Sequence, residues 1–308
     1  MITFVIIKLY CMQDIIKLDS IDQYNQLYGL ETLHPQIAVV DLSKATRVPT
    51  HFTINYGVYA LFLKQTKCGD LRYGKQPYDY QEGTVTSFAP GQIVEVVMAE
   101  PTPPKSVGLL FHPDFIRGGS LGKEIKRYSF FSYASNEALH LSDEEKGIFQ
   151  DCLAKIKSEL GRPIDKHSKH LICKNIELLL DYCMRFYDRQ FDTRSFVYRD
   201  ILGKFEEQLD AYYQGNQPQI SGLPTVKYFA DKFHLSPNYF GDLIKKETGR
   251  TAQEYIQNKI LSVAKEEIMR LDLTISEISY RLGFQQPQHL TRLFKKSVGC
   301  TPKEFRSY

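Results

Sequence analysis

The sequence of 308 residues has no long hydrophobic run. No stretch approaches the roughly 20 apolar residues that a membrane-spanning helix needs. The apolar run at residues 2–7 is short, is followed by Lys8, and lacks the small-residue cleavage site of a signal peptide. With 43% hydrophobic and 24% charged residues, the composition is that of an ordinary soluble protein, long enough for two or three hydrophobic cores. We therefore expect no association with a membrane.

Clusters of metal ligands and paired cysteines are also missing. The six cysteines show no C-x-x-C spacing, several fall on expected apolar faces, and all are consistent with a reducing cytoplasm. His167 and His170 could share a helix face, but no carboxylate or cysteine completes a metal site, so we expect both to face solvent. These counts predict no metal and no cofactor. The cysteines are Cys11, Cys68, Cys152, Cys173, Cys183 and Cys300.

Catalytic motifs are nearly absent. Residues 118–122 spell Gly-Gly-Ser-Leu-Gly, which fits the G-x-S-x-G pattern of a nucleophile elbow. That motif requires a preceding strand in an α/β sheet, and the chain lacks the necessary alternation of strands and helices. We interpret this segment as a loop, expect no catalytic residue, and predict that the protein is not an enzyme.

The sequence does contain a duplication in its last ninety or so residues. From Pro237 and Pro287 onward the two copies run in step at an offset of 50. Two copies are too few for a solenoid, so the repeat predicts a pair of small helical modules. The offset pairs Leu243 with Leu293, Lys245-Lys246 with Lys295-Lys296, and Gly249 with Gly299.

Each copy predicts two short helices joined by a tight turn, which is a helix-turn-helix. In the first copy Thr225 caps one helix, and Ser236 with Pro237 begins the next, which Gly249 ends. In the second copy Thr274 and Glu277 form a capping box. The apolar faces comprise Val226, Phe229, Ala230, Phe233, Phe240, Leu243 and Ile244 in the first copy, and Ile275, Ile278, Leu282, Leu290, Leu293 and Phe294 in the second.

A single long helix is expected between the modules. Thr251 and Glu254 form its capping box, and apolar residues recur every three or four positions over roughly twenty residues. A rigid connector would allow the second helix of each module to enter successive major grooves about 34 Å apart. The apolar residues are Ile256, Ile260, Ala264, Ile268 and Leu271.

The charge distribution favours contact with nucleic acid by this repeat. The segment 220–308 carries 14 Lys and Arg against 9 Asp and Glu, whereas the rest of the chain carries 25 against 27. A lysine pair on an amphipathic helix is commonly only its solvated side. Because both pairs recur at the same point of the duplicated module, phosphate contacts become the preferred interpretation.

At this point the sequence resembles the AraC/XylS family of bacterial transcription regulators. The resemblance covers roughly Leu223 to Arg306. It rests on the double helix-turn-helix, the run Gly283-Phe284 followed by Pro287-Gln-His-Leu-Thr-Arg-Leu-Phe-Lys-Lys296, and the ending Gly299-Cys-Thr-Pro-Lys-Glu-Phe-Arg306. It implies a cytoplasmic, sequence-specific DNA-binding regulator that binds promoter DNA and usually activates RNA polymerase.

The residues expected to contact DNA follow from the outward faces and from the positions that the family uses. Arg292 suits a bidentate contact with guanine, Asn238 can pair with adenine, and Asp242 can accept from a cytosine amino group. Gly241 departs from the family, which commonly has a larger polar residue there. It either weakens reading by the first module or marks a close approach to DNA. The expected base contacts are Asn238, Tyr239, Asp242, Gln288, Thr291 and Arg292, and the expected phosphate contacts are Ser236, Lys245, Lys246, Gln286, Lys295 and Lys296.

Upstream, five β-rich runs separated by glycine and proline turns predict a barrel or sandwich. Residues 82–92 resemble the cupin-like barrel that many family members carry as a sensor. His51 and His112 stand alone, so the ligand set of a metal-bearing cupin is absent. Aromatic residues are frequent here and either line a pocket for an unidentified effector or form ordinary core: Tyr56, Tyr59, Phe62, Tyr73, Tyr78, Tyr80 and Phe88. The runs are residues 37–42, 58–63, 84–88, 93–97 and 107–111.

After Ser142, which forms a capping box with Glu145, the apolar residues recur at helical spacing. This pattern predicts a helical hairpin whose two helices are separated near residues 161–163. The hairpin serves either as a dimerisation surface or only as packing for the barrel. A polar Gly/Pro segment after a further helix, near residues 196–213, is typical of a linker. We expect an α+β chain with a cupin-like β-barrel sensor domain at 1–135, a helical hairpin and connecting helices at 136–213, a linker at 214–222 and the double helix-turn-helix at 223–308.

The expected partners are promoter DNA, RNA polymerase, a small-molecule effector and a second copy of the chain. Met12 is expected to be the natural start, as in this kind of regulator. An alternative function stays open: a cupin-like small-molecule-binding or enzymatic protein whose helical tail interacts with another protein.

Overall fold

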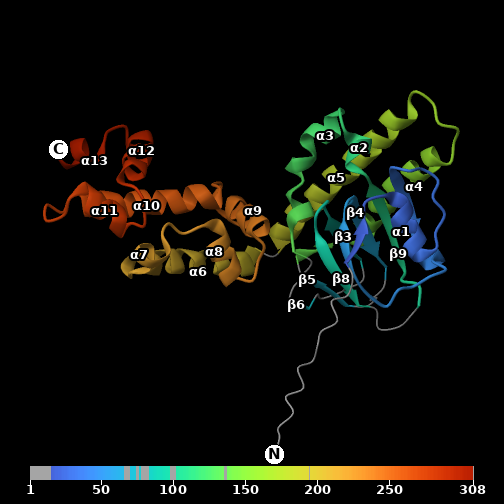
Figure 1. Cartoon of the computed structure of the whole chain (residues 1–308), viewed down its shortest axis with the longest axis horizontal. Helices are drawn as coiled ribbons and strands as arrows, with labels where there is room; N and C mark the ends of the chain where they lie inside the picture. Colours follow the sequence, from blue (N-terminus) through green and yellow to red (C-terminus); the bar gives the residue numbers. More distant parts are fainter. Residues whose placement is uncertain are drawn as a thin grey trace, which may run out of the picture. The chain divides into compact units, whose positions relative to one another are not determined.

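A computed structural model of the chain describes residues 15–65, 70–73, 76–77, 83–97, 102–134, 137–193 and 195–307; for 70–73, 76–77 and 195–197 it describes the backbone only. The chain divides into two compact units, Met1–Gln190 and Phe191–Tyr308. The first unit contains the strands, and the second consists of helices (Figure 1). This arrangement confirms the α+β class expected from the sequence.

The first unit contains two five-stranded sheets. One sheet has the order β1 (Ile15–Leu18), β3 (His51–Tyr56), β8 (Ile93–Val97), β5 (Asp70–Tyr73) and β6 (Gln76–Pro77). The other has the order β10 (Leu139–His140), β7 (Thr84–Phe88), β4 (Tyr59–Lys64), β9 (Ser106–Phe111) and β2 (Ile37–Asp41). The pair β1–β3 is parallel, whereas β3–β8 and β4–β9 are antiparallel.

The cupin-like β-barrel expected for the first unit requires a correction, because its described strands form two sheets, as in the alternative of a sandwich. A barrel needs continuous strand pairing around its circumference. Within the described strands no pairing joins one sheet to the other, and the terminal strands β6 and β10 contain two residues each. The β-rich unit therefore has two separate sheets that face each other across a core.

Alternation along the strands builds this core. In β3 the buried residues are Phe52, Ile54 and Tyr56, and the residues between them are more exposed. The second sheet is buried on both faces, since Leu61 and Phe62 of β4 are both nearly inaccessible. The Tyr56 ring stacks on that of Phe88 at 4.8 Å, so these two aromatic residues belong to the core. The side chains of Tyr73, Tyr78 and Tyr80 lie outside the described residues.

Helices complete the first unit. They are α1 (Ile21–Tyr28), α2 (Pro113–Ile116), α3 (Ser120–Glu124), α4 (Asp143–Leu160) and α5 (Ser168–Thr193). The capping box of Ser142 and Glu145 is confirmed, as is the helical hairpin of α4 and α5. Cys152 and Cys183 are buried on its apolar faces, and burial raises the pKa of the Cys152 thiol.

The Gly-Gly-Ser-Leu-Gly segment is not a simple loop, so that interpretation was wrong in detail. Ser120 is the first residue of α3, and Gly119 caps this helix. The element before it is helix α2 rather than a strand, because Pro113 begins a helix directly after β9. The geometry of a nucleophile elbow is therefore not present around Ser120.

The second unit consists of eight helices within its described range. The caps expected from the sequence are confirmed at Thr225, Ser236, Thr251 and Thr274. A further capping box, Thr301 with Glu304, was missed. The helices are α6 (Ser195–Gln214), α7 (Gln217–Ser221), α8 (Val226–Lys232), α9 (Pro237–Thr248), α10 (Ala252–Ile268), α11 (Ile275–Arg281), α12 (Pro287–Val298) and α13 (Pro302–Arg306).

The boundary between the units differs from the expected linker at 214–222. That segment contains α7, buries Pro218, and places the Gly222 carbonyl as acceptor of a 2.9 Å hydrogen bond from the Tyr212 hydroxyl. Helix α6 belongs to the second unit because the Phe205 ring packs edge-to-face on Phe229 and Phe240 at centroid distances of 5.0 and 5.2 Å. The observed boundary lies at Gln190 and Phe191.

Left-handed residues occupy the turn of each helix-turn-helix: His234 with φ 57° in the first and Gly283 with φ 90° in the second. The left-handed conformation costs a residue that has a Cβ roughly 1–2 kcal/mol of conformational free energy. We expect His234→Gly to raise the free energy of unfolding by about 0.5 kcal/mol, after allowing for the entropy of glycine. Denaturant unfolding tests this. As a control, His289→Gly, inside α12, should lower it by about 0.5–1 kcal/mol; a loss in both variants would contradict the expectation.

Candidate nucleic-acid interface

Helix α12 presents an outward polar face. Pro287 stands at its start, and Leu290 and Phe294 are fully buried, which turns the opposite side of the helix to solvent. Thr291 is half-buried, and its hydroxyl donates to the Pro287 carbonyl at 3.2 Å. The exposed residues are Gln286, Gln288, Arg292, Lys295 and Lys296. The structure thus brings together the residues of the second module expected to contact DNA.

Helix α9 presents fewer of its expected contacts. Asn238 and Lys245 are exposed, and Asp242 is half-buried. The Ser236 side chain accepts from the Tyr239 amide at 3.2 Å and so caps the helix. The Lys246 ammonium lies 3.1 Å from the carboxylate of Asp192, in an ion pair within the second unit. The two modules therefore share a backbone plan but not the same exposed surface.

Tyr239 requires a correction, because it does not face solvent as a base-contacting residue would. Its side chain is 3% exposed. The ring lies 5.0 Å from that of Phe191, and its hydroxyl shares a 2.5 Å hydrogen bond with the hydroxyl of Tyr198. The sequence could not indicate this burial, because Tyr198 and Phe191 lie 41 and 48 positions before Tyr239 in the chain and gave no local signal.

Gly241 lies inside α9 beside open space. A Cβ at this position would meet nothing within 4 Å, so packing within the protein does not require glycine here. The surface of α9 is consequently flat at the position where the second module has Thr291. A flat surface permits a close approach of another backbone or a nucleic acid.

Helix α10 connects the modules. Its capping box is formed by Thr251 and Glu254, and the backbone hydrogen bond from Thr251 lowers the pKa of the Glu254 carboxyl. The apolar residues Ile256, Ile260, Ala264 and Ile268 are buried as expected, but α10 ends at Ile268 and Leu271 is 85% exposed. Figure 1 shows α9 and the group α11–α13 toward opposite ends of α10. The connector thus separates the two recognition helices.

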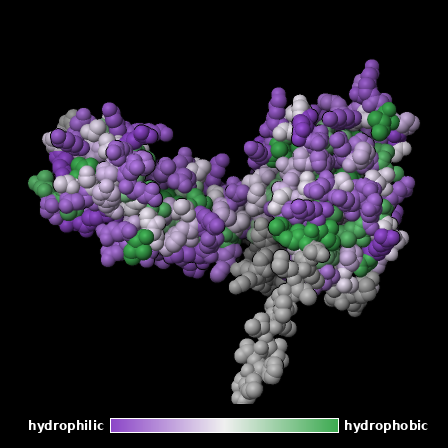
Figure 2. All heavy atoms as spheres, viewed as in Figure 1, coloured by the Kyte–Doolittle hydropathy of each residue, from purple (hydrophilic) through white to green (hydrophobic). Residues whose placement is uncertain are grey.

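Other residues join this connector to α6. The Lys259 ammonium lies 2.5 Å from the Asp210 carboxylate, and the Tyr255 hydroxyl donates to Glu206. Burial, followed by the hydrogen bond to Glu206, raises the pKa of Tyr255 to about 12. The viewed face of this unit is largely hydrophilic, with isolated hydrophobic residues (Figure 2). This surface fits a polar partner better than an apolar one.

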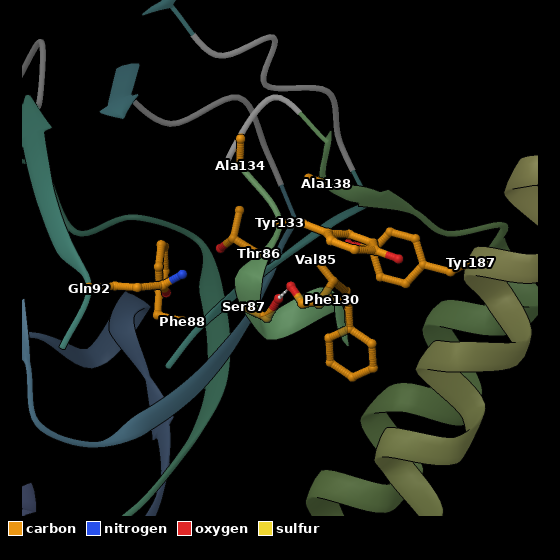
Figure 3. Close-up of a pocket in the computed structure, with 10 residues that line it drawn as sticks. All are labelled: Val85, Thr86, Ser87, Phe88, Gln92, Phe130, Tyr133, Ala134, Ala138 and Tyr187. Atoms are coloured by element: carbon orange, nitrogen blue, oxygen red, sulfur yellow. Dashed lines mark hydrogen bonds between the residues drawn. The ribbon is translucent and has the colours of Figure 1, made fainter. Parts of the chain in front are cut away.

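The first unit has small hollows. One lies between β7, the segment around Tyr133, and Tyr187 of α5; the Ser87 hydroxyl donates to the Phe130 carbonyl at its side (Figure 3). Its volume of about 10 Å³ is far below the roughly 300–1,000 Å³ of small-molecule sites. A second hollow of about 200 Å³ lies between β2 and α4, beside Leu153 and Lys157. Neither identifies an effector.

The histidines expected to be solvent-facing, His167 and His170, are exposed. His51 lies 2.8 Å from Glu95, and the His112 ring accepts from the Asp114 amide at the start of α2. In the part of the chain that the structure describes, no group of three or more His, Cys, Asp or Glu residues could hold a metal ion. No helix there is long and apolar enough to cross a membrane.

A family model described as a helix-turn-helix domain matches residues 229–308. The HTH-type transcriptional regulator YobQ of Bacillus subtilis is 37% identical over 83 residues, which are 27% of this chain and 34% of YobQ. The Transposon Tn10 TetD protein of Escherichia coli is 34% identical over 144 residues, which are 46% of this chain and 91% of TetD. The HTH-type transcriptional activator RhaS of Citrobacter koseri is 32% identical over 77 residues, 25% of this chain and 28% of RhaS.

For the first three curated relatives, the matched part spans 34%, 21% and 18% of their own length. The shared region is the duplicated module whose geometry is described above, with α8–α9 and α11–α12 as its two helix-turn-helix pairs. The TetD match covers nearly all of that protein. The chain belongs to the AraC/XylS family of transcription regulators.

Proposed function

We propose that the protein is a sequence-specific DNA-binding regulator that activates transcription. The observation that carries this proposal is the exposed face of α12. Two lysines, an arginine and a glutamine lie on this face, whereas Leu290 and Phe294 of the same helix are fully buried. An α-helix of this kind fits the major groove of B-form DNA. The basic excess of residues 220–308 supplies the attraction to phosphate that positions such a helix.

Roles for individual side chains follow from their chemistry. Arg292 would make the bidentate contact with guanine, and Gln288 a bidentate contact with adenine. Lys295 and Lys296 would contact phosphate, which fixes register without reading sequence. In the first module Asn238 and Lys245 are the exposed counterparts. Four further residues stay predicted contacts to DNA: Asp242, Thr291, Ser236 and Gln286.

Activation, an effector and a dimer are parts of the same proposal. The relative RhaS is named as a transcriptional activator, which supports activation through RNA polymerase. The α4–α5 hairpin supports a dimer, because Leu171 and Leu178 lie seven residues apart on α5 and are 45% and 41% exposed. The β-rich first unit would bind the effector. The cytoplasm stays the predicted location.

In-vitro selection of random duplexes by the full-length protein tests this function. We expect two short boxes spaced about one helical turn apart. Arg292→Ala should weaken binding of the selected duplex by roughly 1–3 kcal/mol and relax preference at one base pair.

The matched control is Lys295→Ala, on the same helix. It should weaken binding to all sequences alike and lower the slope of affinity against salt by about 1. If Arg292→Ala also weakened binding uniformly, it would contact phosphate only. If the protein selected no motif and bound duplexes without salt dependence, the regulator function would be rejected in favour of a small-molecule-binding or enzymatic protein with a helical interaction tail.

A further inference from the structure

The duplication extends to a third helix in each module. Thr251 and Glu254 form a capping box at the start of α10, and Thr301 and Glu304 form the same box at the start of α13. These pairs are again 50 residues apart. Helix α13 is therefore the second copy of the first turn of α10, although α10 has 17 residues and α13 has 5. Each module consists of three helices, α8–α9–α10 in the first and α11–α12–α13 in the second.

One position of this third helix differs in chemical character between the copies. Ile256 of α10 is fully buried, and its counterpart on α13, at the offset of 50, is Arg306. The Arg306 Nε atom donates to the carbonyl of Ile268 at 2.7 Å, and its Nη2 atom is buried as well. Ile268 is the last residue of α10, so its carbonyl is one of those that the helix itself cannot pair. Arg306 therefore caps the C-terminus of the connector from 38 residues away.

Helix α13 is also attached to the second recognition helix. The Phe305 ring packs edge-to-face on that of Phe294 with centroids 5.3 Å apart, and Phe294 is fully buried in α12. Phe305 and Arg306 are neighbours, so one short helix contacts α12 through an aromatic ring and α10 through a guanidinium group. A charged hydrogen bond from a planar group fixes direction as well as distance, which an apolar contact does not. Arg306 therefore constrains the orientation of α13, and with it that of α12, on the connector.

A second polar contact joins the same end of the connector to α11. The Arg281 guanidinium lies 3.8 Å from the carboxylate of Glu267, which also lies 3.3 Å from Arg270. The turn between α10 and α11 adds little packing, because Met269 and Leu271 are 56% and 85% exposed. The last turn of α10 is thus held by polar contacts to α11 and α13, in addition to the approach of α7 to the turn before α12.

We propose that Arg306 is a positioning residue that fixes the angle of α12 on the connector and thereby sets the spacing at which the protein accepts two DNA boxes. This inference rests on the proposed function and deepens it. Helices α9 and α12 lie toward opposite ends of α10 (Figure 1), so a rotation at this joint moves α12 directly. One base pair changes the separation of two boxes by about 3.4 Å and their relative rotation by roughly 35°. A fixed joint rejects such a change, whereas a loosened joint tolerates it.

Arg306→Met tests the joint in the full-length protein. It keeps a long side chain and removes the donor to Ile268. Binding is measured on three duplexes: the second box alone, both boxes at the spacing that the wild type selects, and both boxes with one added base pair. For the wild type, the added base pair should weaken binding on the order of tenfold or more, because the two modules can no longer engage together.

In Arg306→Met the added base pair should weaken binding by only about two- to threefold. Affinity at the selected spacing should fall several-fold, because the modules are less preorganised. Binding to the second box alone should stay nearly unchanged, since the exposed face of α12 is intact. Arg306→Lys, which restores a donor, should recover part of the spacing preference. A variant that is merely unstable would lose affinity on all three duplexes alike, so the ratio between the two spacings separates positioning from stability.

Lys303→Met is the matched control. Lys303 is exposed on the same helix, and its substitution removes the same charge while leaving the donor to Ile268 in place. Its ratio between the two spacings should equal that of the wild type. If Arg306→Met also kept this ratio, or if the wild type selected a single box or tolerated both spacings equally, the positioning role would be overturned while the DNA-binding function stood. If the wild type selected no motif, the proposed function itself would fail, and this inference with it.

Discussion

Phe205→Ala should unfold the DNA-binding unit under conditions in which the β-rich unit stays folded. Phe205 is fully buried at the junction of α6 with α8 and α9, and its ring contacts Phe229, Phe240 and Tyr255. Truncation of such a side chain removes apolar burial and leaves a cavity, which together lower the free energy of unfolding by about 3–5 kcal/mol. The effect is large because α6 packs against both helices of the first helix-turn-helix.

Hydrogen exchange with mass spectrometry measures this variant, because peptides from each unit are followed separately. Amides of α9 and α10 should lose protection, and those of β4 and β9 should keep it. The matched control is Phe149→Ala, a fully buried residue of α4 in the first unit, which should give the reverse pattern. If the amides of α9 kept their protection in Phe205→Ala, α6 would be only a connecting helix outside the DNA-binding unit.

Gly283→Ala should have the second large effect. Gly283 has φ 90°, and a Cβ there would lie 2.7 Å from the backbone carbon and oxygen of Gly222 and 2.8 Å from the Pro218 carbonyl. None of these atoms belongs to a flexible side chain, so the overlap must be relieved by moving α7 away from the turn before α12. Backbone strain and overlap together should lower the free energy of unfolding by about 3 kcal/mol or more.

Gly241→Ala is the control for this substitution. Its Cβ would meet nothing within 4 Å, and alanine inside a helix is favoured over glycine by up to about 1 kcal/mol. We expect thermal unfolding of the second unit at a lower temperature in Gly283→Ala and at a slightly higher one in Gly241→Ala. Equal tolerance of alanine at both positions would mean that residues 218–222 do not pack on the turn.

Local signals predicted the local structure well. The capping boxes at Ser142, Thr251 and Thr274 marked the first turns of α4, α10 and α11 because each is made by residues three apart in sequence. Two strands, residues 84–88 and 93–97, were predicted at their observed bounds. The strand β3 was missed because His51, Thr53 and Asn55 alternate with its buried residues, and this half-polar stretch lacks a continuous apolar run.

Such local signals could not predict contacts between segments that lie far apart in the sequence. The stretch 214–222 has the glycine and proline content of a linker, yet Pro218 is buried, and its carbonyl oxygen lies beside the turn at Gly283. The outward face of α12 followed from its apolar period and is confirmed by exposure. On α9 Tyr239 was expected among the base contacts, and the three-dimensional position of Phe191 and Tyr198 changes that assignment. Whether these residues contact DNA stays a prediction.

The sheet pairings also bear on how the chain acquires its structure. Strand β2 pairs with β9, and Ile37 lies opposite Phe111, so the first unit closes only after more than seventy residues have been brought together. Helices α8, α9 and α10 instead contact their immediate neighbours in sequence. Because loop closure over long separations slows folding, the helical unit should reach its native state faster than the β-rich unit that the ribosome releases earlier. Refolding from denaturant should therefore show the helical signal returning in a faster phase than the β-sheet signal.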